Sequence, residues 1–398
     1  MSALYGFPRA DGRKGIRNLV AVAYLVECAH HVAREITTQF RDQAVHLVGF
    51  PGCYPNDYAE QVMRQLLCHP NVGAVLLVSL GCESFNKRYI EDEVASSGRP
   101  VHTLTIQSGG GTRSAIAQGV EWVNFALASL AGQSRVPMGW DELVVATVCG
   151  GSDSTSGITA NPAVGRAFDA LVARGATCLF EETGELIGCE PHMQQRAATP
   201  ELGLAIVDAV QKAERYYRVL GHGSFAPGNA DGGLTTIEEK SLGAYAKSGA
   251  SRIRGLINPA QQAPAGGLYL LDVVPDGEVR FGFPNISDNA EIVELISCGA
   301  HLTLFTTGRG SVVGSAISPV IKVCANPQTY ERLHEDMDVN AGRILLGTAT
   351  LDEIGQEILD QVAEVACGAP SKSEALGHQE FIMTYKSFAP KGPSCLPL

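Results

Sequence analysis

The stretch VCGGSDSTSGITANPAVG, residues 148–165, joins a predicted buried strand to a predicted helix. The apolar run Leu143–Val148 leads into it, and apolar residues at helical spacing follow Pro162. Asn161 is a favourable N-cap residue, and Pro162 is a favourable first residue of that helix. In an α/β sheet such a loop lies at the carboxyl edge of the strands, where ligands usually bind. We therefore expect a ligand-binding loop here.

The composition of this loop favours an anion as the ligand. Its glycines let the backbone approach a ligand closely, and free N–H groups at a helix N-terminus attract negative charge. The loop side chains that we expect to bind the substrate are Ser152, Asp153, Ser156, Thr159 and Asn161. The alternative interpretation is a long capped turn, although eighteen residues this polar are more than a turn needs.

Composition restricts the class of protein. The chain has 398 residues, 45% of them hydrophobic, and a net charge of −12. That acidity argues against nucleic acid or an anionic membrane as a partner, because either favours a basic surface. No apolar run approaches the roughly 18 residues of a membrane span, and the N-terminus lacks the apolar core of a signal peptide. We expect a cytoplasmic protein whose 11 cysteines are reduced.

Predicted strands and helices alternate along most of the chain, which indicates an α/β fold with mainly parallel sheets. The first unit, residues 1–137, is predicted to be a Rossmann-like α/β domain with strands at 19–26, 44–50, 74–80 and 101–106. The second, residues 138–398, is predicted to be a catalytic α/β domain with Gly-rich anion-binding loops and an irregular α+β C-terminal part. Its predicted strands are 143–148, 177–181, 268–273, 302–306 and 320–323, and its predicted helices are 162–174, 200–220 and 351–365.

Four cysteines follow predicted strands and are candidate metal ligands. They are Cys28, Cys53, Cys82 and Cys149, and His30 is a fifth candidate. Thiolates and imidazole suit iron, so their convergence would create a site for an iron ion or an iron–sulfur cluster. The alternative is that they are small buried residues, because free cysteine is among the most buried residue types. No C-x-x-C spacing favours a cluster.

Carboxylates and cations elsewhere are candidates for catalysis and substrate binding. Glu182 and Glu185 follow the predicted strand 177–181, and Glu239 and Lys240 lie in the segment IEEKSLG. A carboxylate in such a loop can act as general base or bind a divalent metal, and a lysine can donate a proton. The alternative interpretations are that Glu182 and Glu185 lie in a solvated loop and that Lys240 only forms a surface ion pair with the neighbouring glutamates. Three further residues, Asn229, Arg309 and Lys322, are candidate substrate ligands, since an arginine between glycines suits carboxylate recognition.

Several long motifs resemble the altronate/galactarate dehydratase family. They are the opening stretch 148–165, GFPRADGRKGIRN at 6–18, HPNVGAVLLVSLGCES at 69–84, PGNADGGLTTIEEKSLGAYAKSG at 227–249, FTTGRGS with PVIKVCANP at 305–327, and DMDVNAG at 336–342. The resemblance covers nearly the whole chain. It does not include the small N-terminal domain, of the SAF type, that full-length members carry. In this respect the chain is similar to split members such as sulfolactate sulfo-lyase.

The resemblance implies a lyase that carries out β-elimination on a hydroxy acid. A base removes the proton α to a carboxylate, a divalent metal such as Fe²⁺ or Mn²⁺ stabilises the enediolate, and the product becomes a 2-keto-3-deoxy acid. Within this scheme Glu182, Glu185, Glu239 and Lys240 are the expected catalytic residues. The alternatives are a sulfo-lyase that releases sulfite and a non-catalytic binding or regulatory subunit. A nucleotide site at the glycines 109–111 is disfavoured, since neither G-x-G-x-x-G nor a P-loop occurs.

The resemblance also implies a partner. We expect a separately encoded SAF-domain subunit to complete the site, and we expect the chain to form a homo-oligomer. The segment Arg9–Arg17 is a candidate docking surface for that subunit, with a solvated basic turn as the alternative.

Overall fold

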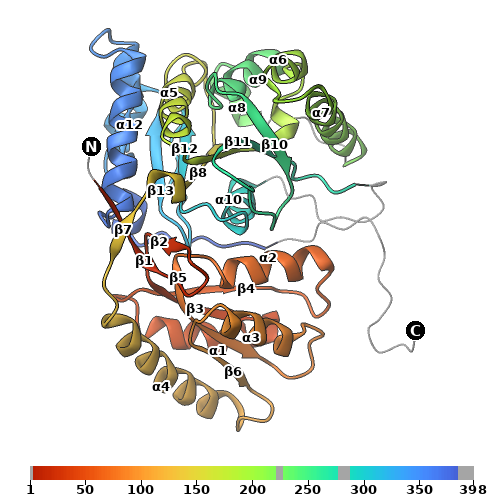
Figure 1. Ribbon diagram of the computed structural model, residues 1–398, viewed down its shortest axis with the longest axis vertical. Coiled ribbons are helices and arrows are strands. Elements are labelled where there is room, and N and C mark those ends of the chain that lie inside the picture. The colour runs from red at the N-terminus through yellow and green to blue at the C-terminus, as the bar shows by residue number, and fades with distance from the viewer. Residues whose placement is uncertain (1–2, 221–226, 277–286, 384–398) are drawn as a thin grey trace.

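The computed structural model describes residues 3–220, 227–276 and 287–383 (Figure 1). The fold is α/β with mainly parallel sheets, as predicted. The first unit contains a parallel four-stranded sheet in the order β4 (Val45–Gly49), β3 (Leu19–Tyr24), β5 (Val72–Ser79) and β6 (Val101–Thr105). Helices α1 (Glu27–Thr38) and α4 (Gly111–Ala131) cover one face, and α2 (Asp57–Leu67) and α3 (Lys87–Ser96) cover the other. The central strands β3 and β5 are mainly apolar because both of their faces are buried, whereas the edge strands β4 and β6 also carry polar residues.

The second unit contains a larger parallel sheet. Its order is β10 (Ile253–Ile257), β11 (Gly267–Leu271), β9 (Thr177–Phe180), β8 (Val144–Cys149), β12 (Leu302–Thr307), β13 (Val320–Cys324) and β14 (Val339–Asn340). Successive residues of a strand point to opposite faces. Val145 therefore joins the core under α5 (Ala160–Ala173) and α12 (Leu351–Ala366), whereas Ala146 joins the core on the other face.

The core on this other face, which contains Ala146, is shared between the two units. It contains residues of β8, β9 and α10 (Asp288–Ser297), and also residues of β3, α2 and α3. Figure 1 shows α2 lying between the two sheets, below α10. The larger sheet is thus covered on this face partly by the first unit, and the two units pack as one body.

A small antiparallel sheet connects the units. β1 (Leu4–Pro8) pairs with β2 (Lys14–Gly15) on one side and with β7 (Val136–Met138) on the other. The intervening turn is not a solvated basic loop throughout, because Arg9 is buried and its Nε donates to the Pro70 carbonyl at 2.7 Å. Arg17 pairs with Glu374 through Nε at 2.7 Å. These two arginines hold the hairpin against the body of the protein.

The remaining elements complete the second unit. They are η1 (Trp140–Glu142), η2 (Thr183–Glu185), α6 (Glu190–Arg196), α7 (Pro200–Leu220), α8 (Pro227–Asp231), α9 (Ile237–Ala246), α11 (Pro327–Arg332), η3 (Ala341–Ile344) and α13 (Lys372–Ala375). No helix within the described residues combines the length and the apolar character needed to cross a membrane.

Candidate active site

The candidate active site lies at the carboxyl ends of β8 and β9, which are neighbours in the larger sheet. Cys149 is the last residue of β8, Glu182 follows β9 by two residues, and Glu185 ends the short helix η2. The Cys149 Sγ and one carboxylate oxygen from each glutamate lie within 4.8 Å of one another. Parallel pairing of the two strands therefore brings together residues that are more than 30 positions apart in the chain.

Two lysines from α9 and its C-cap complete this cluster. The Lys240 Nζ lies 3.0 Å from the Cys149 Sγ, 3.0 Å from the Ser152 Oγ and 2.6 Å from a Glu185 carboxylate oxygen. Lys247, seven residues further on, forms an ion pair with Glu182. Both lysines are buried. Helix α9 reaches the site because it packs closely on the 148–165 loop, where Gly157 meets Gly243.

Glu182 is held in an unusual backbone conformation. Its φ of 74° lies in the left-handed region, which non-glycine residues seldom adopt. One carboxylate oxygen accepts the Cys149 backbone N–H at 2.9 Å, and the other accepts from Lys247. Strained residues of this kind cluster at functional sites, where the surrounding contacts fix them. The backbone conformation and these two contacts fix the orientation of the Glu182 carboxylate.

The cluster sets different protonation preferences for its two glutamates. Burial opposes the charge of both, but Lys247 and Lys240 outweigh it at Glu182 and lower the pKa of that carboxyl. At Glu185 burial prevails, with repulsion from Glu182, and the pKa of that carboxyl is raised. Burial also raises the pKa of the Cys149 thiol, to about 12. Two carboxyls with opposite shifts form the arrangement expected of an acid–base site.

The donor set fits a divalent metal ion. One sulfur and two carboxylates are ligands that iron, manganese and zinc accept. In the described part of the chain, this is the one group of three His, Cys, Asp or Glu residues with ligand atoms this close. The Lys240 ammonium group contacts two of the three donors, Cys149 and Glu185. A positive charge therefore already lies beside the proposed metal ligands.

The predicted four-cysteine site is not formed among the described residues. Cys28, Cys53 and Cys82 are exposed and belong to the first unit, whereas Cys149 lies in the other sheet. His30 is bonded through Nδ1 to Glu27 at 3.0 Å. Cys149 fails to join the others because it follows a strand of the other sheet, and strand ends converge only within one sheet. Cys28, Cys53 and Cys82 follow neighbouring strands of one sheet, but among the described residues they do not form a group of close ligand atoms.

Most of the polar loop side chains bond within the protein. Asp153 accepts from the Thr155 N–H at 2.9 Å and from the Asn326 side chain at 3.0 Å, and the Ser156 Oγ donates to it at 3.3 Å. The Thr159 Oγ1 donates to the Ala325 carbonyl at 3.0 Å. These groups shape the loop and leave Ser152 as the loop hydroxyl in contact with Lys240.

Helix α5 begins two residues earlier than predicted. Thr159 occupies the N-cap position and Ala160 is the first helical residue, so Asn161 is not the N-cap. The Asn161 side chain instead donates to the Gly243 carbonyl at 3.0 Å. Its contribution is therefore to fasten α9, which carries Lys240, to this helix.

The other predicted residues fall into two groups. Asn229 and Arg309 lie beside the loop: the Asn229 Oδ1 accepts the Ser152 N–H at 3.0 Å, and the exposed Arg309 donates to the Gly228 carbonyl. Lys322 is buried, and its Nζ donates to the Val313 carbonyl at 3.2 Å. Glu239 is exposed; its carboxylate accepts the Thr235 N–H at 2.9 Å, and its backbone N–H donates at 3.2 Å to the Oγ1 of Thr236, the N-cap of α9. Neither Lys322 nor Glu239 contacts the Cys149 cluster in the described hydrogen bonds.

Two residues of the site were not singled out from the sequence. Lys247 lies at i+7 from Lys240, a spacing that repeats one helix face and would have suggested it. Asp288, the first residue of α10, lies so close to Gly150 that a Cβ there would be 3.0 Å from its Oδ2. Burial, with repulsion from Glu182 and Glu185, raises the pKa of Asp288 to about 6. No sequence pattern distinguishes it from an ordinary residue of a first helical turn.

Comparison with known proteins places this site in a family. The C-terminal domain of D-galactarate/altronate dehydratase matches residues 140–388, and the second domain of D-galactarate dehydratase/altronate hydrolase matches residues 6–131. The chain belongs to the galactarate/altronate dehydratase family. Its members include dehydratases and a lyase, and the chain is accordingly an enzyme of the lyase class.

Three curated relatives span most of the chain. The chain is 32% identical to the (2R)-sulfolactate sulfo-lyase subunit beta of Chromohalobacter salexigens, over 95% of this chain and 96% of that protein. It is 30% identical to altronate dehydratase of Bacillus subtilis, over 91% of this chain and 73% of that protein. It is also 30% identical to galactarate dehydratase of Escherichia coli, over 91% and 72% respectively.

Proposed function

We propose that this enzyme dehydrates a sugar acid such as altronate or galactarate to a 2-keto-3-deoxy acid by β-elimination. The observation that carries the proposal is the buried Lys240 ammonium, which contacts Cys149, Ser152 and Glu185 together. Such a group supplies both positive charge and a transferable proton where a carboxylate substrate develops negative charge. The named relatives supply the reaction class.

The proposed proton transfers divide between Glu185 and Lys240. Glu185 is the proposed base, because it is the partly exposed carboxylate of the pair and has the raised pKa. It takes the proton α to the substrate carboxylate. Lys240 is the proposed acid and gives its proton to the departing 3-hydroxyl, which leaves as water. Glu182, fixed by Lys247 and by the Cys149 N–H, positions the cluster.

Substrate binding is assigned to the groups around the loop. Arg309 lies exposed beside Gly151, where its guanidinium suits a carboxylate. The Ser152 backbone N–H donates to the Asn229 side chain, and this bond orients Ser152. The Ser152 hydroxyl lies next to Lys240. Among the predicted substrate ligands, these three are the ones that support the proposal.

A divalent metal is part of the proposal. Cys149, Glu182 and one carboxylate oxygen of Glu185 would hold it, which leaves the second Glu185 oxygen to take the proton; Fe²⁺ or Mn²⁺ is the expected ion, and it would supply Lewis-acid stabilisation of the enediolate. An iron–sulfur cluster is less well supported, since one cysteine belongs to the described ligand group. We also propose a cytoplasmic location.

A partner subunit and a second substrate class are supported by one relative. The sulfo-lyase relative is named a subunit, so we propose that a separate small chain, of the SAF type, joins this one. The chain matches that relative over 96% of its length, which favours sulfite release from sulfolactate as a second candidate reaction. Homo-oligomer formation is a further proposal.

The decisive experiment is a substrate panel. Purified protein, loaded with Fe²⁺ or Mn²⁺ under anaerobic conditions, is incubated with altronate, galactarate and sulfolactate. Formation of a 2-keto acid without sulfite supports the dehydratase, and sulfite with a keto acid supports the sulfo-lyase. Lys240→Met is the matched inactive control. No turnover of any of these substrates, alone or with a co-purified small subunit, would contradict both assignments.

A further inference from the structure

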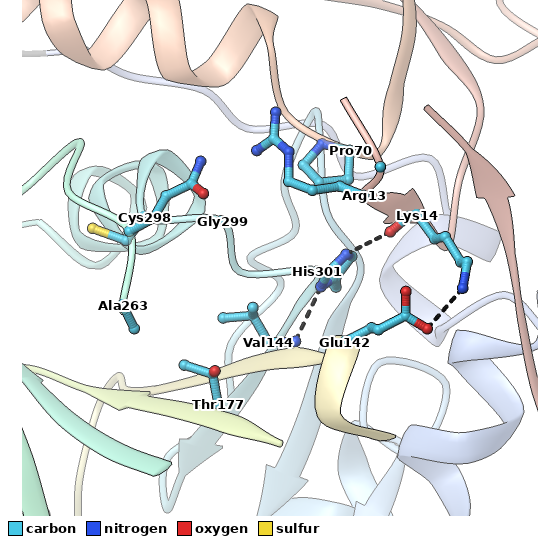
Figure 2. A pocket seen from close by; sticks show the side chains of 12 residues that line it. Arg13, Lys14, Pro70, Glu142, Val144, Thr177, Ala263, Cys298, Gly299 and His301 are labelled. Atoms are coloured by element: carbon cyan, nitrogen blue, oxygen red, sulfur yellow. Dashed lines mark hydrogen bonds and ion pairs between the residues drawn. The ribbon is translucent and has the colours of Figure 1, made fainter. Parts of the chain in front are cut away.

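A second cavity lies at the opposite end of strand β8 from Cys149 (Figure 2). It has a volume of about 260 Å³ and is lined by the β1–β2 hairpin, by the starts of β8 and β9, and by the turn between α10 and β12. Val144 lines it, and Cys149 is five residues further along the strand, a rise of roughly 16 Å. A small molecule bound here would therefore not reach the candidate active site.

His301 forms a fixed wall of this cavity. Its Nδ1 accepts the Val144 backbone N–H at 3.0 Å, and its Nε2–H donates to the Lys14 carbonyl at 2.8 Å (Figure 2). Burial lowers the pKa of His301 to about 4, so the ring is neutral. The imidazole therefore connects the β1–β2 hairpin to β8 of the larger sheet through two hydrogen bonds. The cavity lies beside this contact between the two units.

The surroundings of the cavity carry an excess of positive charge. Arg13 and Lys14 line it, while Arg9 and Arg99 lie behind the hairpin in the protein interior. Only two carboxylates face these four cations in the described contacts: Glu142 pairs with Lys14 at 2.8 Å, and Asp11 pairs with Arg13 at 2.7 Å and Arg99 at 3.4 Å. This local excess contrasts with the net charge of −12 of the whole chain.

Arg9 illustrates the imbalance. Its described partners are the Pro70 and Arg17 carbonyls and the side-chain oxygens of Asn18 and Gln133, and none of them is charged. Burial, followed by repulsion from Arg99, lowers the pKa of Arg9 to about 10. An anion near the hairpin would therefore be attracted by more cations than the protein itself neutralises.

Arg13 provides the donor for such an anion. Its Nε and Nη2 bond to Asp11, and Nη2 also donates to the Cys68 carbonyl. Its Nη1 has no hydrogen-bond partner in the described part of the chain, and the side chain is 30% exposed. In Figure 2 Arg13 extends from the hairpin across the cavity, opposite Val144 and Thr177. We propose that this cavity is a second binding site, for a small oxyanion that presents a carboxylate or phosphate group to Arg13.

A bound anion would lie between Arg13 on the hairpin and the starts of β8 and β9 in the larger sheet. It would therefore stabilise the packing of the two units and raise the melting temperature of the protein. The proposal rests on no part of the proposed catalytic function, because its residues and its readout are separate.

The test is calorimetric titration of the purified protein with inorganic phosphate and, in a second arm, with propionate, each against chloride at equal ionic strength. We expect saturable binding of at least one anion, and the two arms show which group the site prefers. Arg13→Gln should weaken that binding about tenfold or more, as loss of a charge-assisted hydrogen bond predicts. Arg113→Gln, an exposed arginine on α4, should leave the affinity unchanged.

Two further variants keep the test decisive. Ala263→Leu adds volume at the cavity wall without changing charge and should also weaken binding, even if Arg13→Gln fails to fold. Lys240→Met, at the candidate active site, should bind the anion as the wild type does. Absence of saturable binding by both anions, unchanged affinity in Ala263→Leu, or loss of binding in Lys240→Met would each overturn the proposal.

Discussion

The Nζ of Lys240 lies 3.0 Å from the Sγ of Cys149, and both side chains are almost fully buried. The thiol, with its pKa raised to about 12, is neutral at physiological pH. Burial opposes the charge of Lys240, but its interactions with Cys149, Glu185 and Glu182 outweigh burial and raise the pKa of the ammonium group well above its usual value. A buried ammonium in this setting is a strong local source of positive potential.

The first prediction concerns Lys240 as proton donor. Lys240→Met keeps the length of the side chain but removes its charge, and it should lower kcat by at least ~100-fold, as loss of a general acid does. Lys212→Met is the matched control, since Lys212 pairs with Asp272 elsewhere in the second unit. Steady-state kinetics with the substrate identified in the panel measure both. A Lys240→Met enzyme with normal kcat would remove Lys240 from the chemistry.

The second prediction concerns metal. Chelation should abolish activity, and Fe²⁺ or Mn²⁺ should restore it. Cys149→Ser should lower metal affinity about 10-fold or more, because a ligand of the wrong softness replaces sulfur. Elemental analysis and metal titration provide the readout. Cys178→Ser is the control, a buried cysteine on the neighbouring strand β9 that lies outside the ligand group. Full activity of the metal-free protein under strong chelation would refute metal dependence.

The third prediction concerns Arg309. Arg309→Lys keeps the charge but loses the planar pair of donors that grips a carboxylate. We expect KM to rise roughly 10-fold with a folded protein, in line with one lost charge-assisted hydrogen bond. Arg34→Lys, on the exposed side of α1, should change nothing. Unaltered KM and kcat in Arg309→Lys would take this residue out of the substrate site.

The fourth prediction concerns pH and stability. His301 has a folded pKa of about 4, below its unfolded value of about 6.5. The unfolded chain therefore binds a proton that the folded chain does not, and stability falls as the pH drops from about 6.5 towards 4. His301→Gln should flatten this part of the stability curve, measured by urea unfolding at several pH values. The exposed His334→Gln should leave the slope as it is.

Local pattern was sufficient to predict much of the fold. The predicted strand 143–148 corresponds to β8 at Val144–Cys149, and the predicted helix 200–220 corresponds to α7 at Pro200–Leu220. Both have apolar residues at the spacing that their secondary structure requires. The small sheet β2–β1–β7 is not predicted: the pairing of β1 with β7 joins segments more than 120 residues apart, which no local pattern indicates. The sequence also predicts a loop over residues 221–233; residues 221–226 lie outside the described residues, and Pro227–Asp231 forms the short helix α8.

The candidate site was predictable to a lesser degree. Glu182, Glu185, Lys240, Ser152 and Cys149 come together, and each was flagged by its place after a strand or inside a motif. The four-cysteine site and the N-cap role of Asn161 were wrong, since tertiary packing decides both. Lys247 and Asp288 acquire their significance from burial beside other charges, which no single stretch of sequence displays.

The core that β8, β9 and α10 share with β3, α2 and α3 has a consequence for how the protein folds. If the chain were divided near Gly139, each fragment would present to water a broad apolar face that its counterpart now covers. Each half would then be less stable alone than within the intact chain, so the stabilities of the two units are coupled through this shared core. This coupling also means that a destabilising mutation in α2 should loosen the packing of β8 and β9, the strands that position the Cys149 cluster.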